Sequence, residues 1–372
     1  MIYTEYGKTG KQVSQVGFGG MRFDTDRDQE ENAELVRYAN LEGINYFDTA
    51  PGYCNDQSED IFGLAFQDMP ADYWVATKGM PVNFDTADKA RSAVEKSLKR
   101  LGVEKINFYH IWCLRKMEHY HLAMQPGGQF EGLKKCQEEG LIDHITFSSH
   151  QPGEQIRSIL DEGYMDGVLL GMNILNFPYR WAGVKAAWES GCGTVAMNPL
   201  AGGMIPKNED KFDFLSMNEN ETPTEAALRF TVSCQYLDIA LVGFTDKEHV
   251  DSACAVADRC TPFSDNDLEE IQKHLSSNMN EICTACGYCD GCPQNIPIPA
   301  YMQFYNSKQM FGTSDEQMKK SLNGERDWGM LAARQADAGD CVECKICEEK
   351  CTQNINIIDR LKEIAEWEKD LD

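Results

Sequence analysis

Two runs of cysteines near the C-terminal end of the chain have the spacing of metal ligands. The first run, CTACGYCDGCP, contains Cys283, Cys286, Cys289 and Cys292, and the second, CVECKICEEKCT, contains Cys341, Cys344, Cys347 and Cys351. Thiolates three residues apart suit metal coordination better than cross-linking, and free thiols fit a reducing cytoplasm. The spacing therefore predicts metal centres rather than disulfides in this part of the chain.

A second group of reactive side chains lies in the first third of the chain. The motif FDTAPGY contains Asp48 and Tyr53, and VATKG contains Lys78. An ammonium group stabilises a phenolate, so we expect Lys78 to lower the pKa of Tyr53 from its ordinary value near 10. Asp48 would keep Lys78 charged, and Tyr53 would donate a proton to a carbonyl being reduced. Each residue taken singly also has an ordinary structural role, as a cap, a solvated strand end or a packed ring.

The elements that must position these side chains follow an alternating pattern. Eight short apolar, β-rich runs are separated by helix-like stretches with start signals such as Thr86 and Thr222-Pro223. The predicted strands are 15–19, 45–50, 74–79, 106–114, 143–150, 167–175, 193–200 and 239–245. Alternation requires parallel strands with crossover helices, and eight units predict a closed (β/α)8 TIM barrel. An open doubly wound sheet is the alternative, but GFGGMRFDTD contains no G-x-G-x-x-G fingerprint.

Length and charge limit the classes of partner. A chain of 372 residues fits one large and one small domain. With 60 acidic and 35 basic residues, its formal charge of -25 disfavours nucleic acid and anionic membranes as partners. We find no apolar run long enough for a membrane span and no signal peptide at MIYTEYGKTGKQ, so we expect a cytoplasmic protein.

The sequence resembles the aldo/keto reductase superfamily over roughly residues 1–260. The landmarks are YGKTGKQVSQVGFGGMR, FDTAPGYCNDQSEDIFG, VATKG, HITFSSH and MNPLAGG. The resemblance implies a barrel that transfers hydride from NADPH to a carbonyl with an Asp, Tyr, Lys and His tetrad, and it assigns Asp48, Tyr53 and Lys78 to three of these roles. In KINFYHIWC the family histidine position falls on Trp112. His110 lies two residues earlier and is expected on the same strand face, one layer deeper.

The resemblance also implies positions for a nicotinamide cofactor. They are Gly20, Met21, Ser148, Ser149, Met197, Leu200, Gly202, Gly243 and Thr245. Several polar contacts of the family are replaced, because Met197 stands for the stacking tyrosine, Leu169 for a glutamine, and His249 for the arginine that meets the cofactor phosphate. A cleft is therefore expected at the strand ends, with weak provision for NADPH.

The cysteine runs resemble those of two-cluster bacterial ferredoxins, in which the fourth cysteine of each run reaches the other cluster. This implies one 4Fe-4S cluster on Cys283, Cys286, Cys289 and Cys351, and a second on Cys341, Cys344, Cys347 and Cys292. Structural zinc is the alternative, but zinc would leave the third cysteine of each triplet surplus. The segment between the runs, PIPAYMQFYNSKQMFGTSDEQMKKSL, reads as helix. We expect a barrel at 1–262, a linking helix at 263–282 and a small, mainly α-helical ferredoxin-like domain at 283–372.

These features favour an iron-sulfur oxidoreductase that reduces a small organic substrate, with Tyr53 as proton donor and electrons passed through the clusters. Direct delivery of single electrons to the substrate or to a bound flavin is a variant of this prediction. One alternative is an electron-transfer protein with a non-catalytic barrel that docks to a ferredoxin or flavoprotein. Another is an ordinary NADPH-dependent carbonyl reductase with accessory clusters.

Overall fold

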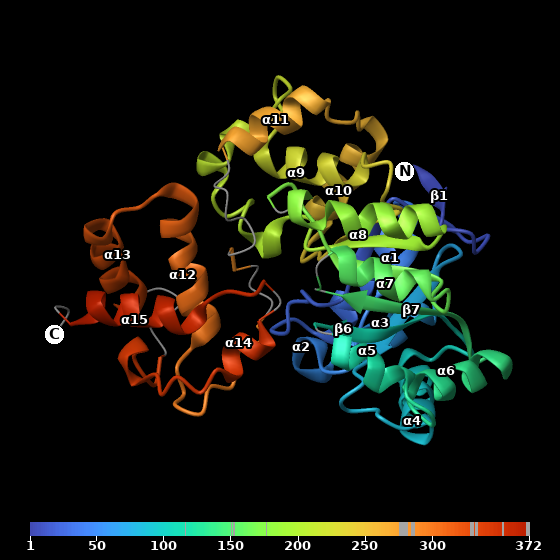
Figure 1. Ribbon diagram of the computed structural model, residues 1–372. Helices are drawn as coiled ribbons and strands as arrows, with labels where there is room; N and C mark the ends of the chain where they lie inside the picture. Colours follow the sequence, from blue (N-terminus) through green and yellow to red (C-terminus); the bar gives the residue numbers. More distant parts are fainter. Residues whose placement is uncertain are drawn as a thin grey trace. The chain divides into compact units, whose positions relative to one another are not determined.

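The computed structural model describes residues 1–115, 117–149, 151, 153–175, 177–274, 282–283, 287–327, 331, 334–351 and 353–369 (Figure 1). The described chain forms two compact units. The first comprises Met1–Leu200 with Ile205–Ser264, and the second comprises Ala201–Met204 with the described residues from Asp265 onward. The loop after the seventh barrel strand therefore contributes four residues to the second unit, which the sequence pattern did not indicate.

Eight parallel strands form a closed barrel in the first unit, as predicted, and the open sheet is excluded. Their order around the barrel is β10-β3-β4-β5-β6-β7-β8-β9. The strands are β3 (Val16–Gly19), β4 (Tyr46–Asp48), β5 (Trp74–Gly79), β6 (Ile106–Leu114), β7 (Ile142–Ser149), β8 (Gly167–Gly171), β9 (Gly193–Met197) and β10 (Ile239–Val242). A short antiparallel hairpin of β1 (Tyr3–Glu5) and β2 (Gln12–Ser14) precedes them.

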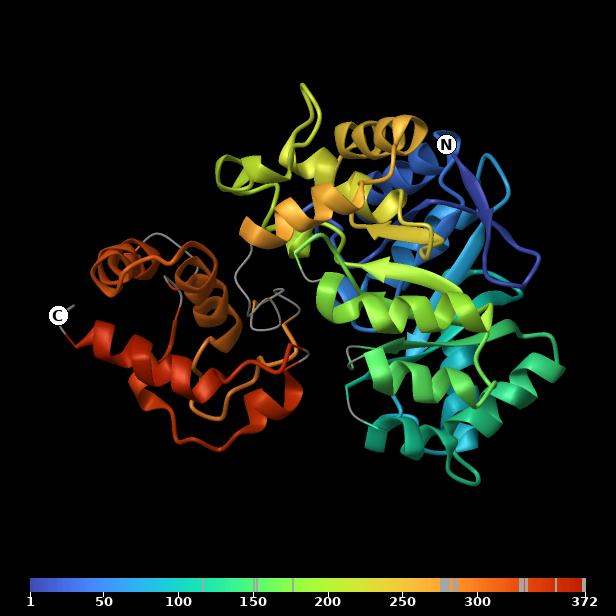
Figure 2. The ribbon, with the colours of Figure 1, turned by 45° about the horizontal axis from the view of Figure 1, so that its top comes forward.

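Helices surround the barrel strands (Figure 2). They are α1 (Gln29–Leu41), α3 (Ser58–Phe66), α4 (Ala87–Leu101), α5 (Met117–Met124), α6 (Gln129–Glu138), α7 (Gly153–Asp161), α8 (Phe177–Ser190), α9 (Pro223–Val232) and α10 (Lys247–Arg259). Their start signals act as predicted. The Thr86 side chain accepts from the Lys89 N–H at the start of α4, and Thr222 and Glu225 form a capping box at the start of α9.

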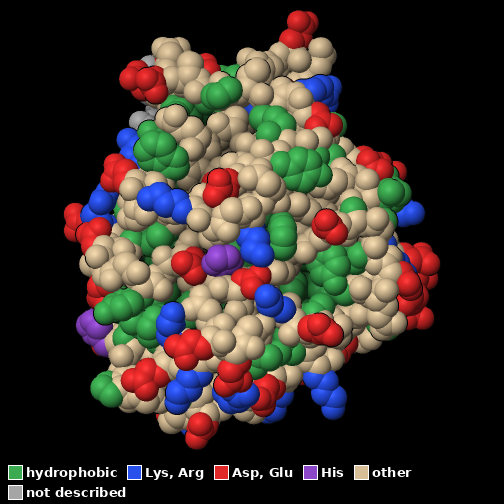
Figure 3. Space-filling model, turned by 90° about the vertical axis from the view of Figure 1, so that its right-hand side faces the viewer, with side chains coloured by type: hydrophobic (Ala, Val, Ile, Leu, Met, Phe, Trp, Pro, Cys, Tyr) green, Lys and Arg blue, Asp and Glu red, His purple; other side chains and the backbone are tan. Residues whose placement is uncertain are grey.

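Apolar side chains fill the barrel interior. Tyr46, Phe108, Leu169 and Ile239 belong to one buried cluster, which also includes Tyr6 from the segment after β1. The outer surface is mixed in charge, and Figure 3 shows acidic and basic side chains interspersed over one face. Within the described part of the chain, no helix combines the length and hydrophobicity that crossing a membrane would require.

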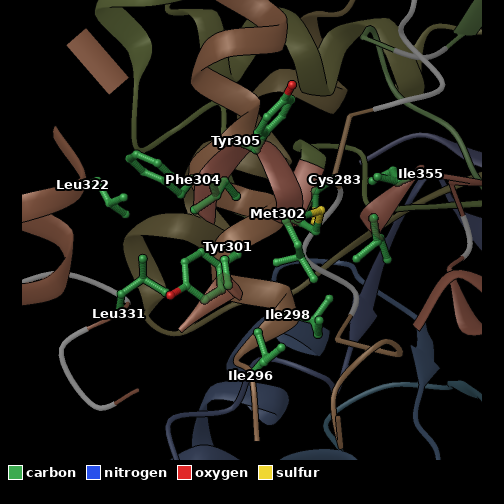
Figure 4. Close-up of a cluster of buried hydrophobic side chains, with 14 of the residues drawn as sticks. Cys283, Ile296, Ile298, Tyr301, Met302, Phe304, Tyr305, Leu322, Leu331 and Ile355 are labelled. Carbon is green, nitrogen blue, oxygen red and sulfur yellow. The ribbon is translucent and has the colours of Figure 1, made fainter. Parts of the chain in front are cut away.

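The second unit is mainly helical. It contains α11 (Asp265–His274), α12 (Ile298–Phe311), α13 (Asp315–Asp327), α14 (Ile346–Lys350) and α15 (Ile357–Glu368). The segment between the cysteine runs thus forms two helices, as expected. A core of its own includes Tyr301, Tyr305 and Trp367, and it also takes in Cys283 and Cys347 (Figure 4).

Candidate active site and cysteine cavity

Asp48 and Lys78 form a buried ion pair at neighbouring strand ends. Asp48 is the last residue of β4 and pairs in register with Ala76 of β5, two residues before Lys78. The Lys78 Nζ donates to Asp48 Oδ1 at 2.5 Å, and both side chains are almost fully buried. Burial alone would raise the pKa of Asp48, but the Lys78 ammonium and His110 together lower it below its usual value. Burial lowers the pKa of Lys78, and Asp48 opposes this shift.

His110 completes a network with this pair. His110 is a residue of β6 that lies opposite Lys78 of β5 on one side and Thr146 of β7 on the other. Its Nε2 is 3.3 Å from Asp48 Oδ2, and its Nδ1 is 2.7 Å from Thr146 Oγ1. Burial lowers the pKa of His110, Asp48 opposes this shift, and the nearby Lys78 ammonium adds to it, so the neutral ring is favoured. His110 therefore contacts Asp48 of the predicted catalytic group. The resemblance places the family histidine position at Trp112 instead.

Tyr53 lies above the ion pair. The Lys78 Nζ is 5.3 Å from the centre of the Tyr53 ring, and Trp112 meets the same ring edge to face at 5.6 Å. Burial raises the pKa of Tyr53 well above its ordinary value, and the charge on Asp48 raises it further. The expected lowering of the pKa of Tyr53 is therefore wrong, because burial and the charge on Asp48 outweigh any stabilisation of the phenolate by Lys78. Arg22 is the cation that opposes the rise. Tyr53 accordingly keeps its proton at neutral pH, which is the form a proton donor needs.

The backbone around Tyr53 adopts an unusual conformation. Tyr53 begins α2 (Tyr53–Asp56), and positive φ values occur at Gly52 (85°), Cys54 (53°), Asn55 (55°) and Asp56 (65°). Asn and Asp tolerate the left-handed region better than other residues, whereas Cys54 has no such preference. Each non-glycine residue in this region costs about 1–2 kcal/mol. Strain is therefore concentrated in the three residues that directly follow Tyr53, the residue that the sequence assigns to proton donation.

Trp112 lies beside an irregularity in β6. The register with β7 shifts between Ile111 and Leu114, and Cys113 has a φ of 60°. The Cys113 N–H donates to Ser148 Oγ at 2.7 Å, which holds the bulge against β7. Bulges beside sites commonly redirect a side chain. Here Trp112 is half-buried against Tyr53, while His110 is fully buried, in agreement with the expected difference in depth.

The predicted cofactor positions lie at or just after the ends of β3, β7, β9 and β10, but several of their polar groups already have protein partners. The Ser149 hydroxyl donates to the Leu114 carbonyl and accepts from the Gln151 N–H. The Gly20 N–H donates to the Asp48 carbonyl. A side chain at position 20 would collide with Ser58 and Phe62. Met21 is exposed.

The remaining positions contribute little charge or polarity. Met197 is half-buried against the barrel core, and Leu200 is half-buried. Gly202 lies in the short helix η1 (Ala201–Gly203). Gly243 is in close contact with the stem of Arg22.

The N-terminus of α10 already carries an acidic cap. Asp246 accepts from the His249 N–H at 2.9 Å, and its other oxygen is 3.2 Å from the His249 ring. Thr245 Oγ1 also lies 3.1 Å from His249 Nδ1. A bound anion at this helix end would be repelled by the Asp246 carboxylate, which already accepts from a backbone N–H of the first turn. Weak provision for the phosphate of NADPH stays a prediction.

Five predicted cluster ligands gather around one small cavity in the second unit. Cys289, Cys292, Cys341, Cys344 and Cys347 line it together with apolar side chains such as Ile298 and Ile358. The four ligands assigned to the second cluster, including the crossed Cys292, are all present there. Among the described residues, no three His, Cys, Asp or Glu side chains are arranged to hold a metal ion as they stand. Cys286 lies outside the described residues.

The described parts of the two cysteine runs share positive φ at two corresponding positions. The residue after the middle cysteine has positive φ in both runs, 77° at Gly287 and 64° at Lys345. Alternation of right- and left-handed residues turns backbone N–H groups inward, as in many iron-sulfur sites. After the fourth cysteine, Asn295 and Asn354 again share positive φ, 58° and 53°. Both runs continue in the sequence as C-x-Q-N-I-x-I, which leads into α12 in the first case and α15 in the second. This repeat is a signal of the sequence beyond the cysteine spacing.

Two residues with roles in these sites were not identified from the sequence. Asn306 on α12 is buried, and its side-chain amide accepts from the Cys283 N–H and donates to the Cys283 carbonyl, both at 2.8 Å. It therefore fixes the backbone of the first predicted ligand. Thr146 fixes the His110 ring in the barrel. Neither residue belongs to a motif, so only their contacts reveal them.

Comparison with known proteins places the barrel among aldo/keto reductases. Residues 15–276 match the aldo/keto reductase family. The chain is 24% identical over 308 residues to "Probable aldo-keto reductase 1" of Glycine max, covering 71% of this chain and 86% of that protein. It is 30% identical over 222 residues to L-galactose dehydrogenase of Arabidopsis thaliana, covering 54% and 65% respectively. The holo form of aldo-keto reductase AKR11C1 from Bacillus halodurans has the same fold, with a TM-score of 0.62 at 22% identity over 73% of this chain and 96% of that one.

Proposed function

Because this chain belongs to the aldo/keto reductase family, we propose that it is an oxidoreductase that reduces a small organic substrate at the mouth of its barrel with electrons from two 4Fe-4S clusters. The substrate would carry a carbonyl or a related unsaturated group. The names of its relatives, among them L-galactose dehydrogenase, support a carbonyl or the corresponding alcohol as the reacting group. Tyr53, above the buried pair of Asp48 and Lys78, supports the barrel as the place of reaction.

In this proposal Tyr53 supplies the proton that goes to the substrate oxygen, while two electrons delivered by the clusters and a second proton, taken from solvent by the carbon, complete the two-electron reduction. A protonated phenol can donate a hydrogen bond to the substrate oxygen and transfer its proton as negative charge develops there. The Lys78 ammonium would stabilise the phenolate that remains, and Asp48 holds that ammonium in place. Neutral His110 orients Asp48 from the layer below. Trp112 offers an indole N–H and an apolar face beside the substrate position, without acid or base chemistry of its own.

The cysteine cavity is the observation that carries the iron-sulfur part of the proposal. It brings Cys292 of the first run together with Cys341, Cys344 and Cys347 of the second, which is the crossed set. Cys283, Cys286, Cys289 and Cys351 would hold the other cluster. When bound, such clusters supply electrons one at a time. The positive φ values shared by the two runs support two equivalent sites rather than a single metal ion.

The weak provision for NADPH favours an electron donor other than a nicotinamide. The acidic cap at Asp246 and the apolar Met197 and Leu169 lack the charge and polarity that this cofactor would need. We propose a reduced ferredoxin or flavoprotein as the physiological donor, and a bound flavin remains compatible with the barrel mouth. The intact group of Asp48, Tyr53 and Lys78 argues against a barrel that serves only as a carrier, because electron carriage has no use for a proton donor.

A comparison of electron donors tests this function. Purified under anaerobic conditions, the protein should reduce its carbonyl substrates faster with dithionite-reduced viologen or reduced ferredoxin than with NADPH. Turnover should disappear when the clusters are removed. If NADPH bound in the low micromolar range and stereospecific hydride transfer survived cluster removal, the family's ordinary nicotinamide mechanism would hold instead.

A further inference from the structure

Arg100 on α4 contacts the strained turn that carries Tyr53. Its Nη1 donates to Asp56 Oδ1 at 2.7 Å, and its Nη2 donates to the Asp56 backbone carbonyl. Nε and Nη2 also donate to the two oxygens of Asp60 at 3.1 and 2.8 Å. One guanidinium thus holds the last left-handed residue of the turn and the first turn of α3 together.

A glycine in α3 makes this contact possible. At Gly63 an added Cβ would lie 2.1 Å from the Arg100 carbonyl oxygen. Helix interiors disfavour glycine, so its presence here allows α3 and α4 to approach closely at the level of Arg100. The other end of the turn is closed by the Gly52 N–H, which donates to Asp56 Oδ1 at 2.9 Å. Asp56 therefore links Arg100 to both ends of the segment that contains Tyr53.

Tyr53 depends on this turn for its position. Within the described part of the chain its hydroxyl forms no hydrogen bond, and its ring contacts the Lys78 ammonium and the Trp112 ring. Cys54, Asn55 and Asp56 would each favour a right-handed conformation if released. Such a change immediately after Tyr53 would move its side chain, and a displacement of about 1 Å can lower a rate by about 100-fold.

We propose that Arg100 is a positioning residue that clamps the left-handed turn and thereby fixes the Tyr53 hydroxyl at the barrel mouth. The proposal rests on Tyr53 being the proton donor of the proposed function. Arg100 lies on the outer layer of the barrel, where it also pairs with Glu59 and Asp60. It reaches the turn that carries Tyr53 through Asp56 rather than by contact with the reacting atoms. The clamp would explain why a Cys can be kept in a conformation that usually requires glycine.

The variant Arg100→Gln should therefore lower kcat by about 10- to 100-fold with little change in KM. Hydrogen exchange of the amides at residues 52–57 should become faster. Arg91→Gln is the matched control, because Arg91 lies on the same helix and is half-buried like Arg100, with ion pairs to Glu95 and Glu139. It should keep both the activity and the exchange rates. Should Arg100→Gln fail to fold, Asp56→Asn removes the charge partner in a milder way and should show the same direction of change.

A rescue experiment separates strain from lost stability. In the Arg100→Gln background, Cys54→Gly should restore part of kcat, because glycine adopts positive φ without penalty. Cys54→Ser removes the same thiol without relieving the backbone and should restore nothing. Unchanged exchange at residues 52–57 in Arg100→Gln, or equal recovery with Gly and Ser, would overturn the clamp. Full activity in Tyr53→Phe would instead overturn the proton-donor role, while the exchange rates would still report on Arg100.

Discussion

Replacing Tyr53 with phenylalanine should lower the rate of substrate reduction by about 100- to 10,000-fold, whichever electron donor is used. The change removes one hydroxyl and leaves the ring, which still packs edge to face against Trp112. Burial and Asp48 keep the phenol protonated in the resting protein, so the variant loses the proton itself. Steady-state rates with reduced viologen and with NADPH, measured on the same carbonyl substrate, check this prediction.

The control for this variant is Tyr3→Phe, which removes a hydroxyl that donates only to the Gly43 carbonyl. Its turnover should match that of the unmodified protein. The iron content and the visible spectrum of Tyr53→Phe should also be unchanged, because the cysteines are untouched. Turnover within a few-fold of normal would show that another group delivers the proton.

Replacing Lys78 with methionine should destabilise the barrel by about 3–5 kcal/mol, because it leaves the Asp48 charge buried without its partner. Activity should fall at the same time, since the phenolate of Tyr53 would lose its stabilising cation. The double variant Lys78→Met, Asp48→Asn should recover much of the stability but none of the activity. Chemical denaturation of the three proteins measures both parts of the prediction.

The pH dependence of Lys78→Met gives a second check. In the unmodified protein the pKa of Asp48 is lowered, so the stabilisation from the pair is present above about pH 4 and is lost as the pH falls further. In the variant His110 alone opposes the effect of burial on Asp48, so we expect the pKa of Asp48 to rise and stability to fall as the pH rises. The difference in stability between the two proteins should therefore shrink on acidification, and a constant difference from pH 7 to pH 4 would contradict the ion-pair account.

The sequence alone predicted the barrel, because buried strands must be apolar and eight such runs alternate with helical stretches. Strand ends were less certain: the expected run at 167–175 continues four residues beyond β8, since Met172 and Leu175 are buried in the loop that follows. Asp48, Lys78 and Tyr53 were recognisable because they lie at or just after the ends of consecutive strands. The positions of the motifs thus predicted which side chains lie close together, but they did not predict the pKa values of those side chains.

The features that were missed depend on contacts between distant residues. The sequence around Cys54 gives no signal of its left-handed conformation. In our proposal this conformation is held by Arg100 through Asp56, and these two residues are 44 positions apart. The raised pKa of Tyr53 follows from burial and from the charge on Asp48, which together reverse the expectation drawn from Lys78 alone. Asn306 likewise acts on Cys283 only after folding.

Iron and acid-labile sulfide, counted in protein purified under anaerobic conditions, test the central claim most directly. Two complete sets of cysteine ligands predict about eight iron and eight sulfide per chain, with a brown colour and broad visible absorption that is bleached by dithionite. Zinc should be absent from such a preparation. Stoichiometric zinc with no visible charge-transfer absorption would contradict the account and leave the cysteine runs as structural metal sites.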